Sequence, residues 1–391
     1  MTYFIGLDLA KFKHDCFVMN ENGEIIKDSF SFTNDSIGFN TLLNVLSSLD
    51  SIQEKRIGLE ATGHYGSNLK IFLEENNFSF MEINPILISR FSKATTLRRT
   101  KTDKIDARLI AMYLSTIDYK PYPTKSYHVK NLKSLCRTRE SLVKQRSLQL
   151  VRLTNVLDLI FPEFKPFFDG KLKASTALYI LENYGVPSKI ARMTIDSFNK
   201  MKSNLRHTIS YARFIELKEL AKNTVGNEDP ILSFELDLHL ELFKELDSKI
   251  NDVESLILDE YENVSSHIHT IPGIGPISAA SIFSEIGNIS RFNNPNQLLA
   301  FAGLEPSRIQ SGEADYCGHM VKHGSSYLRQ YLMNVAESQL IHNPLLYDYY
   351  LKKRNEGKHH RVALSHIAKR LVRIIFSLEK NDVDFDMNKM K

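Results

Sequence analysis

The order of predicted elements in the first 115 residues constrains the fold of this chain most strongly. Three strand-like segments come first, at Tyr3–Leu9, Cys16–Met19 and Glu24–Phe32, with an Asn-Glu-Asn-Gly turn at 20–23 between the second and third. Helical and strand patterns then alternate. They are helix Ile37–Leu49, strand Arg56–Glu60, helix Ser67–Glu75, strand Phe78–Ile83, and helices Pro85–Ala94 and Thr102–Ser115.

A three-stranded meander followed by alternating helices and strands is the element order of the ribonuclease H-like fold. The N-terminal part of the chain is therefore predicted to be an α/β domain of this class, like that of RuvC. In such a sheet the first and fourth strands are neighbours, so residues at their ends are expected to converge.

The remainder of the chain is predicted to be all-α. Apolar residues recur at roughly heptad spacing from Leu132 to Ile160, and again from Phe243 to Ile257, which predicts two helices that pair as an antiparallel coiled-coil arm with a helical insertion at about 163–230. The expected domains are a nuclease-like domain at 1–122, the arm with its insertion at 123–265, and a mainly helical C-terminal domain at 266–391.

Composition excludes several classes of protein. The chain is 42% hydrophobic and 25% charged, which is typical of a globular protein, and no apolar run reaches the 18 or so residues of a membrane span. Its three cysteines form neither a disulfide framework nor a zinc motif, which favours a reducing cytoplasm. Net charge is only +4, but basic residues cluster at 90–104, 125–152 and 352–373. Such local patches are solvated helix faces or sites for nucleic acid.

Four carboxylates are the candidate catalytic residues. Asp8 interrupts the first apolar strand, Glu60 ends the fourth strand, and Asp103 and Asp106 are three residues apart at a helix start, on one helical face. Converging acids suit Mg²⁺ or Mn²⁺, and two such ions promote phosphodiester cleavage. Each acid also has a plain alternative; Asp103, for example, favours a helix N-terminus electrostatically.

Two further patterns lie in the C-terminal part. The sequence Ile-Pro-Gly-Ile-Gly-Pro at 271–276 precedes a predicted helix and resembles a helix-hairpin-helix motif, in which Gly273 and Gly275 let backbone amides approach a phosphate; the alternative is a tight turn. Ser311 precedes a glycine in a predicted loop, with Lys322, His323 and Arg329 near enough in sequence to supply positive charge to a serine nucleophile. Most Ser-Gly pairs are turns.

Together these motifs resemble the DEDD transposases of insertion sequence family 110. The matching segments are Gly-Leu-Asp-Leu-Ala-Lys at 6–11, Glu-Ala-Thr-Gly-His-Tyr at 60–65, Lys-Thr-Asp-Lys-Ile-Asp-Ala at 101–107, Ala-Gly-Leu-Glu-Pro at 302–306, Gln-Ser-Gly at 310–312 and Lys-His-Gly at 322–324. The resemblance is loose between about 125 and 265.

The resemblance implies that Asp8, Glu60, Asp103 and Asp106 bind Mg²⁺ or Mn²⁺, and that Ser311 forms a covalent link to DNA. It also implies a homo-oligomer, dimer or tetramer, that works on donor and target DNA with a structured guide RNA from the element's own ends, in the cytoplasm with the nucleoid. Arg98, Arg99, Lys101, Gly273, Gly275, Lys322 and Arg329 are the candidate nucleic-acid contacts.

Two other functions fit part of the sequence. A RuvC-like junction resolvase or structure-specific endonuclease would use the four acids and water, leaving Ser311 idle, but it does not need the long C-terminal half. A non-catalytic nucleic-acid scaffold would gain little from clustered acids beside DNA. Metal-dependent DNA cleavage separates the scaffold from the enzymes.

Overall fold

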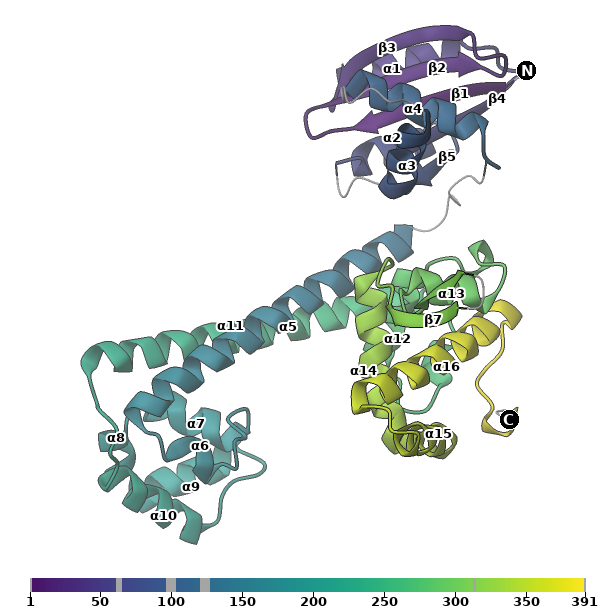
Figure 1. Cartoon of the computed structure of the whole chain (residues 1–391). Helices are drawn as coiled ribbons and strands as arrows, with labels where there is room; N and C mark the ends of the chain where they lie inside the picture. Colours follow the sequence, from purple (N-terminus) through teal and green to yellow (C-terminus); the bar gives the residue numbers. More distant parts are fainter. Residues whose placement is uncertain (1, 61–64, 96–102, 120–126, 312–313, 390–391) are drawn as a thin grey trace. The chain divides into compact units, whose positions relative to one another are not determined.

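The computed structural model describes residues 2–60, 65–95, 103–119, 127–311 and 314–389. Its internal contacts divide the chain into two units, Met1–Lys125 and Ser126–Lys391 (Figure 1). Each unit has its own hydrophobic clusters.

The first unit is built on a five-stranded mixed sheet of order β3-β2-β1-β4-β5. β1 pairs antiparallel with β2 and parallel with β4, β2 pairs antiparallel with β3, and β4 pairs parallel with β5. The strands are β1 (Thr2–Leu9), β2 (Lys13–Asn20), β3 (Ile25–Thr33), β4 (Glu54–Glu60) and β5 (Phe80–Ile83). The predicted meander and the adjacency of the first and fourth strands are therefore confirmed.

Helices cover both faces of this sheet. α1 (Ser36–Ser48) and α2 (Ser67–Glu75) pack on the odd-numbered residues of β1, such as Ile5 and Leu7. α3 (Pro85–Thr95) and α4 (Asp103–Ser115) pack on the opposite face, against Phe4 and Phe17. Alternation of side chains along each strand gives the two faces their separate cores.

Two long helices form the arm of the second unit. α5 (Tyr127–Ile160) and α11 (Pro230–Glu262) pack against each other, and each is about 50 Å long at 1.5 Å per residue. Arg139 Nε lies 2.6 Å from Glu254 Oε1, and further along α5 Arg146 pairs with Asp247. Partner numbers on α11 fall as those on α5 rise, so the pair is antiparallel, as the heptad patterns predict.

A helical insertion connects the arm helices. It comprises α6 (Phe164–Phe167), α7 (Ser175–Asn183), α8 (Pro187–Ala191), α9 (Ile195–Asn204) and α10 (Tyr211–Lys222). Its core is rich in phenylalanine: Phe161, Phe164 and Phe214 are at most 1% exposed. These rings pack with apolar residues of α5 and α11, so the insertion shares a core with the end of the arm.

The C-terminal body packs on the other end of the arm and is mainly helical, with one small hairpin. Its elements are η1 (Ile268–Thr270), α12 (Pro276–Ile286), η2 (Ile289–Arg291), α13 (Pro295–Phe301), β6 (Pro306–Ser311), β7 (Ala314–Met320), α14 (Ser326–His342), α15 (Pro344–Asn355), α16 (His360–Asn381) and η3 (Met387–Lys389). Leu132 and Cys136 of α5 and Ile257 of α11 join its core. Among the described helices, none is long and apolar enough to cross a membrane.

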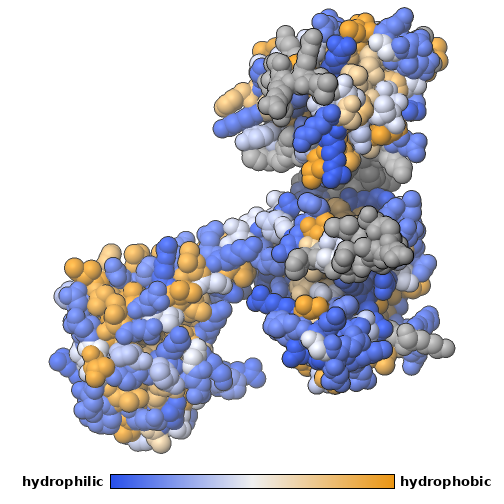
Figure 2. All heavy atoms as spheres, in the orientation of Figure 1, coloured by the Kyte–Doolittle hydropathy of each residue, from blue (hydrophilic) through white to orange (hydrophobic). Residues whose placement is uncertain are grey.

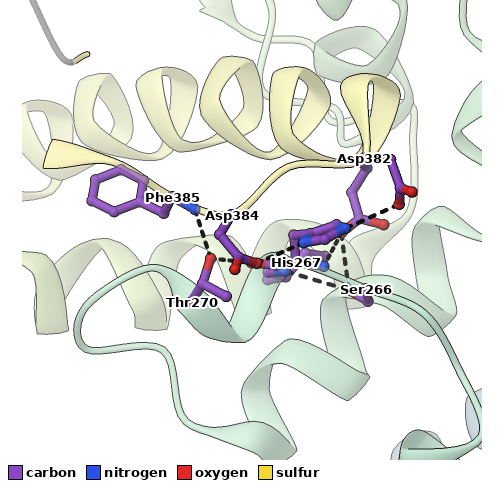
Figure 3. A network of polar contacts seen from close by, with 8 residues as sticks. Ser266, His267, Thr270, Asp382, Asp384 and Phe385 are labelled. Carbon is purple, nitrogen blue, oxygen red and sulfur yellow. Dashed lines mark hydrogen bonds and ion pairs between the residues drawn. The ribbon is translucent and has the colours of Figure 1, made fainter. Parts of the chain in front are cut away.

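The segment after α16 is held against η1 by a polar network (Figure 3). The His267 ring lies between two carboxylates, with Nδ1 2.7 Å from Asp384 and Nε2 3.0 Å from Asp382. Hydrogen bonds to Asp384 and Asp382 raise the pKa of His267. Phe385 N donates to Thr270 Oγ1 over 2.9 Å, so backbone contacts reinforce this attachment.

Candidate active site

Asp8 and Glu60 lie at the same end of two adjacent parallel strands. Leu7 of β1 is in register with Leu59 of β4, so Asp8 and Glu60 are the next residues of the two strands. Asp8 shares a strand face with Gly6, and Glu60 shares one with Gly58, because side chains alternate. Gly6 and Gly58 are both covered by α4, so both acids lie on the face that carries α4. Both side chains are partly buried.

The fit between α4 and β1 depends on Gly6. A Cβ atom on Gly6 would lie 2.0 Å from the Ala107 carbonyl oxygen and 2.7 Å from the Ala111 amide nitrogen, both backbone atoms. Only glycine lets the helix backbone come this close to the strand. The contact places the first turn of α4, with Asp106, beside the strand that carries Asp8.

The segment after α4 is anchored on β4 and β5. Tyr119, just past the end of α4, donates its hydroxyl to Ser79 O over 3.0 Å and contacts Ile57 N of β4 at 3.3 Å. Ile57 is the middle residue of β4 and Ser79 comes just before β5, so the segment that follows α4 reaches these two strands. Asp103 and Asp106 lie in the first turn of α4, at the other end of the helix. Asp106 is partly buried; the side chain of Asp103 is outside the described residues.

A fifth acid, which the sequence analysis missed, lies beside Asp8. Asp15 of β2 is the antiparallel register partner of Asp8, so the two share a sheet face. Asp15 is 1% exposed, and its Oδ1 accepts a 2.6 Å hydrogen bond from Ser31 Oγ. The strand was predicted to begin at Cys16, which left Asp15 outside it; β2 in fact begins at Lys13.

The donor chemistry of this face fits a hard divalent cation. Asp8, Glu60 and Asp106 supply carboxylate oxygens, which Mg²⁺ and Mn²⁺ prefer over nitrogen or sulfur. Asp15 adds a buried carboxyl group on the same sheet face, which accepts a hydrogen bond from Ser31. Among the described side chains, which do not include Asp103, no group of three or more His, Cys, Asp or Glu is close enough together to hold a metal ion.

Ser311 ends a β-strand. β6 and β7 form an antiparallel hairpin in which Ser311 pairs with Ala314, and residues 312–313 between them lie outside the described residues. The predicted loop around Ser311 is thus wrong on its N-terminal side: the serine is the last residue of a paired strand. A strand end fixes the backbone of Ser311 more firmly than an open loop does.

Lys322 and Arg329 flank the turn that follows the hairpin. Lys322 is exposed and has a left-handed backbone, with φ +57°. Arg329 Nη1 donates to Ala302 O over 3.3 Å and to Lys322 O over 3.4 Å, so its guanidinium joins this turn to the end of α13. A Cβ on Gly324 would lie 2.0 Å from the Phe301 carbonyl oxygen, which explains why glycine follows Lys322 and His323.

The Pro-Gly-Ile-Gly segment forms a turn before α12. Gly273 has φ +80°, and a Cβ there would meet the His342 ring at 2.8 Å, whereas one on Gly275 would meet nothing within 4 Å. Ser338 Oγ donates to Gly273 O over 2.8 Å, and Gln339 Nε2 donates to Pro272 O over 2.8 Å. Side chains of α14 thus hold the turn by donating hydrogen bonds to the backbone carbonyls of the turn. The other predicted nucleic-acid contacts, Arg98, Arg99 and Lys101, lie outside the described residues.

Two family models match this chain. A transposase model of the DEDD type of IS110 matches residues 5–162, and a model of the IS116/IS110/IS902 transposase family matches residues 265–351. The first range includes all four predicted acids and the second includes Ser311.

Several relatives match over nearly the whole chain. A Streptomyces coelicolor protein named for the mini-circle element IS117 is 25% identical, covering 95% of this chain and 92% of the relative. The pilin gene-inverting protein of Moraxella bovis is 23% identical, covering 98% of this chain and 97% of the relative. The transposase for insertion sequence element IS1111A of Coxiella burnetii is 24% identical over 68% of this chain and 62% of the relative. With both family models matched in order along the sequence, the chain belongs to the IS110 family of insertion-sequence transposases.

Proposed function

We propose that this transposase cuts and rejoins DNA with a metal-dependent acidic centre at Asp8, Glu60, Asp103 and Asp106, and with Ser311 as the nucleophile. The observation that carries the proposal is the register of β1 and β4, which sets Asp8 and Glu60 side by side on the sheet face covered by α4. The sheet order β3-β2-β1-β4-β5 supports the ribonuclease H-like, RuvC-like domain that the proposal includes.

Each acid has a defined part in this proposal. Asp8 and Glu60 are held by the sheet, and Asp103 and Asp106 are one turn apart at the start of α4, so sheet and helix approach the ligand from two sides. A bound divalent cation supplies charge stabilisation for the phosphate oxygens. Asp15 of β2 is the register partner of Asp8 and adds a second carboxyl group beside it.

Ser311 supplies covalent chemistry in the proposal. Its hydroxyl oxygen forms a new bond to phosphorus, one bridging P–O bond of the DNA breaks, and the released sugar oxygen takes a proton while the serine loses one. The reverse attack by a sugar hydroxyl on another strand frees the serine and rejoins DNA. Holding the broken strand as an ester conserves the energy of the phosphodiester, so rejoining needs no other energy source.

The partners follow from the same family resemblance. We infer that the chain works as a homo-oligomer, that the Asp8 and Ser311 centres meet between subunits, and that a structured RNA from the ends of the element guides donor and target DNA. The Pro-Gly-Ile-Gly turn, with Gly273 and Gly275, and the exposed Lys322 are inferred to contact phosphates. The division into domains at 1–122, 123–265 and 266–391 stays part of this proposal, as does location with the nucleoid.

The test is to incubate the protein with Mg²⁺, DNA flanking the element and RNA from its ends, and then to look for DNA that stays on the protein through denaturation. Asp8→Asn is expected to abolish strand cleavage, and Ser311→Ala to remove the covalent product. Cleavage without any adduct in the parent protein would overturn the serine mechanism in favour of a water-using, RuvC-like endonuclease. Full cleavage by Asp8→Asn would overturn the acidic centre, and binding without cleavage in the parent protein would point to a scaffold.

A further inference from the structure

The net positive charge of residues 344–373 exceeds that of the whole chain. This segment includes α15, the following turn and the first part of α16. This segment has eight Lys or Arg residues against two acids, Asp348 and Glu356, for a net charge of +6, whereas the 391 residues together carry +4. The basic residues are Lys352, Lys353, Arg354, Lys358, Arg361, Lys369, Arg370 and Arg373. Positive charge concentrated in this way attracts polyanions.

The fold places most of these charges in solvent. α15 and α16 pack together through buried residues such as Leu346 and Leu364, and Gly357, with φ +78°, turns the chain between them. Lys352, Lys358 and Arg361 are exposed around that turn, and Arg373 is exposed further along α16. In Figure 2 the surface over α15 is predominantly hydrophilic. We call α15, the turn and α16 as far as Arg373 the basic surface.

Few carboxylates neutralise the basic surface. Lys353 pairs with Glu356 at 2.8 Å, but Lys352, Lys358, Arg361 and Arg373 form no ion pair within 4.0 Å in the described part of the chain. Two exposed lysines elsewhere pair with an acid three residues away on the same helix: Lys249 with Asp252 on α11, and Lys222 with Glu219 on α10. Burial and then the charges of Lys369, Lys353 and Lys358 lower the pKa of His366, which agrees with a positive local potential.

Aromatic rings lie among these cations. The Arg370 guanidinium carbon is 3.7 Å from the centroid of the Tyr349 ring, and Lys353 Nζ is 5.4 Å from the same centroid. Stacking on Tyr349 holds the planar Arg370 group in place. Tyr347 is 41% exposed, and its ring lies in a stacked arrangement with the Tyr350 ring, at a centroid distance of 6.4 Å. An exposed ring beside a basic surface is suited to stack on an unpaired base.

We propose that the basic surface binds the sugar–phosphate backbone of a nucleic acid, and that Tyr347 stacks on an unpaired base next to it. The inference deepens the proposed function and rests on it, since it gives a DNA recombinase a binding surface. The family model that matches the C-terminal part ends at residue 351, so α16 and the eight Lys and Arg residues of the basic surface lie beyond it.

The test replaces the four exposed cations that form no ion pair, in the full chain, as K352Q/K358Q/R361Q/R373Q. Binding of labelled 20-residue probes of duplex DNA, single-stranded DNA and RNA is measured by fluorescence anisotropy over a range of salt, with EDTA present so that no cleavage occurs. The matched control, K173Q/R192Q/K200Q/R206Q, removes the same charge from exposed positions of the helical insertion. Circular dichroism verifies that both variants fold.

For at least one probe, affinity is expected to fall at least about tenfold at 0.1 M salt, because each lost phosphate contact lowers the slope of log K against log salt by about 0.9 for duplex or 0.7 for a single strand. The probe that responds identifies the bound form. Equal slopes for the parent and the variant with all three probes, or an equal loss in the control, would overturn the proposal. Tyr347→Ala is expected to weaken only single-stranded probes, and unchanged single-strand binding would remove the stacking part.

This outcome is separable from that of the proposed function. Binding in EDTA does not depend on Asp8 or Ser311 chemistry, so a protein that never cleaves DNA can still confirm the basic surface. Conversely, the parent protein could cleave DNA and form the adduct while the basic-surface variant binds nucleic acid as tightly as the parent. That result would support the proposed chemistry and overturn the proposal that the basic surface binds nucleic acid.

Discussion

At the scale of single residues, Asp15 is the position where structure adds most to the candidate centre. It is buried, in register with Asp8 and hydrogen-bonded to Ser31. Asp15→Asn keeps the shape and the hydrogen bond from Ser31 but removes a carboxyl group beside Asp8. We expect the melting temperature of the metal-free protein to stay the same or to rise by roughly 2–4 °C, because repulsion between neighbouring carboxyl groups is relieved. The rise in melting temperature on adding Mg²⁺ or Mn²⁺ is expected to shrink.

Thermal unfolding followed by circular dichroism measures both effects, since the chain has no tryptophan. Asp28→Asn is the control, because Asp28 lies exposed on β3 and should change neither quantity. A lower melting temperature with an unchanged response to metal would make Asp15 a purely structural residue.

At the scale of elements, the position of α4 depends on the bare backbone of β1. Gly6→Ala would put a methyl group 2.0 Å from a backbone oxygen of α4, which cannot move without shifting the helix. We expect a loss of at least about 1–3 kcal/mol in the free energy of unfolding of the first unit, as for other overpacked positions, together with loss of cleavage because Asp106 moves. Urea denaturation and the cleavage assay test this.

Gly58→Ala is a matched comparison. Gly58 is the register partner of Gly6, but a Cβ there would meet only the Leu114 side chain, at 2.6 Å, and a side chain can rotate away. Its cost should be clearly smaller. Equal destabilisation by the two substitutions would contradict the view that backbone contact at Gly6 sets the position of α4.

The elements also show how far sequence reasoning reaches. The strands and helices of the first unit were predictable because apolar alternation and helical periodicity are strong there; α2 was predicted with the bounds observed, Ser67–Glu75. The β6–β7 hairpin was not predicted, because Pro-Ser-Arg-Ile-Gln-Ser and Ala-Asp-Tyr-Cys-Gly-His-Met show little alternation and pair only with each other. α15 was missed although Asn343 caps it and Pro344 begins it, both ordinary start signals.

The candidate site was predictable in part for a related reason. Asp8 and Glu60 end strands whose order in the sheet follows from the order of elements, so their adjacency could be inferred. Asp15 could not be, because strand boundaries are the weakest part of such predictions and a start three residues too late leaves it outside β2.

At the scale of the second unit as a whole, one buried carboxylate joins the arm to the C-terminal body. Glu285 of α12 is 2% exposed; its Oε1 accepts from Arg137 Nε of α5 at 2.7 Å, and its Oε2 accepts from Ser325 Oγ, the N-cap of α14, at 2.9 Å. Lys133 Nζ of α5 lies 3.5 Å from Oε2. Three helices therefore meet at one side chain, just after the Lys-His-Gly turn that follows the Ser311 hairpin.

The charge of Glu285 is expected to matter for the stability of this junction. Burial alone would raise the pKa of Glu285, but the hydrogen bond from Arg137 and the charges of Lys133 and Arg137 outweigh it and hold the pKa below its ordinary value of 4.5. Glu285→Gln should cost roughly 2–3 kcal/mol of unfolding free energy, less than the ~3–5 kcal/mol of a fully buried pair, because water screens the partly exposed Arg137.

The pH dependence gives this prediction its sharpest check. A depressed carboxyl pKa stabilises the fold fully above the unfolded value, near 4.5, and the contribution disappears as pH falls through the lower folded value. Urea unfolding of the parent and Glu285→Gln should therefore differ most at neutral pH and converge in acid below about pH 4.5. A difference that stays constant across this range would show that packing and hydrogen-bond shape, rather than the charge of Glu285, hold the arm to the C-terminal body.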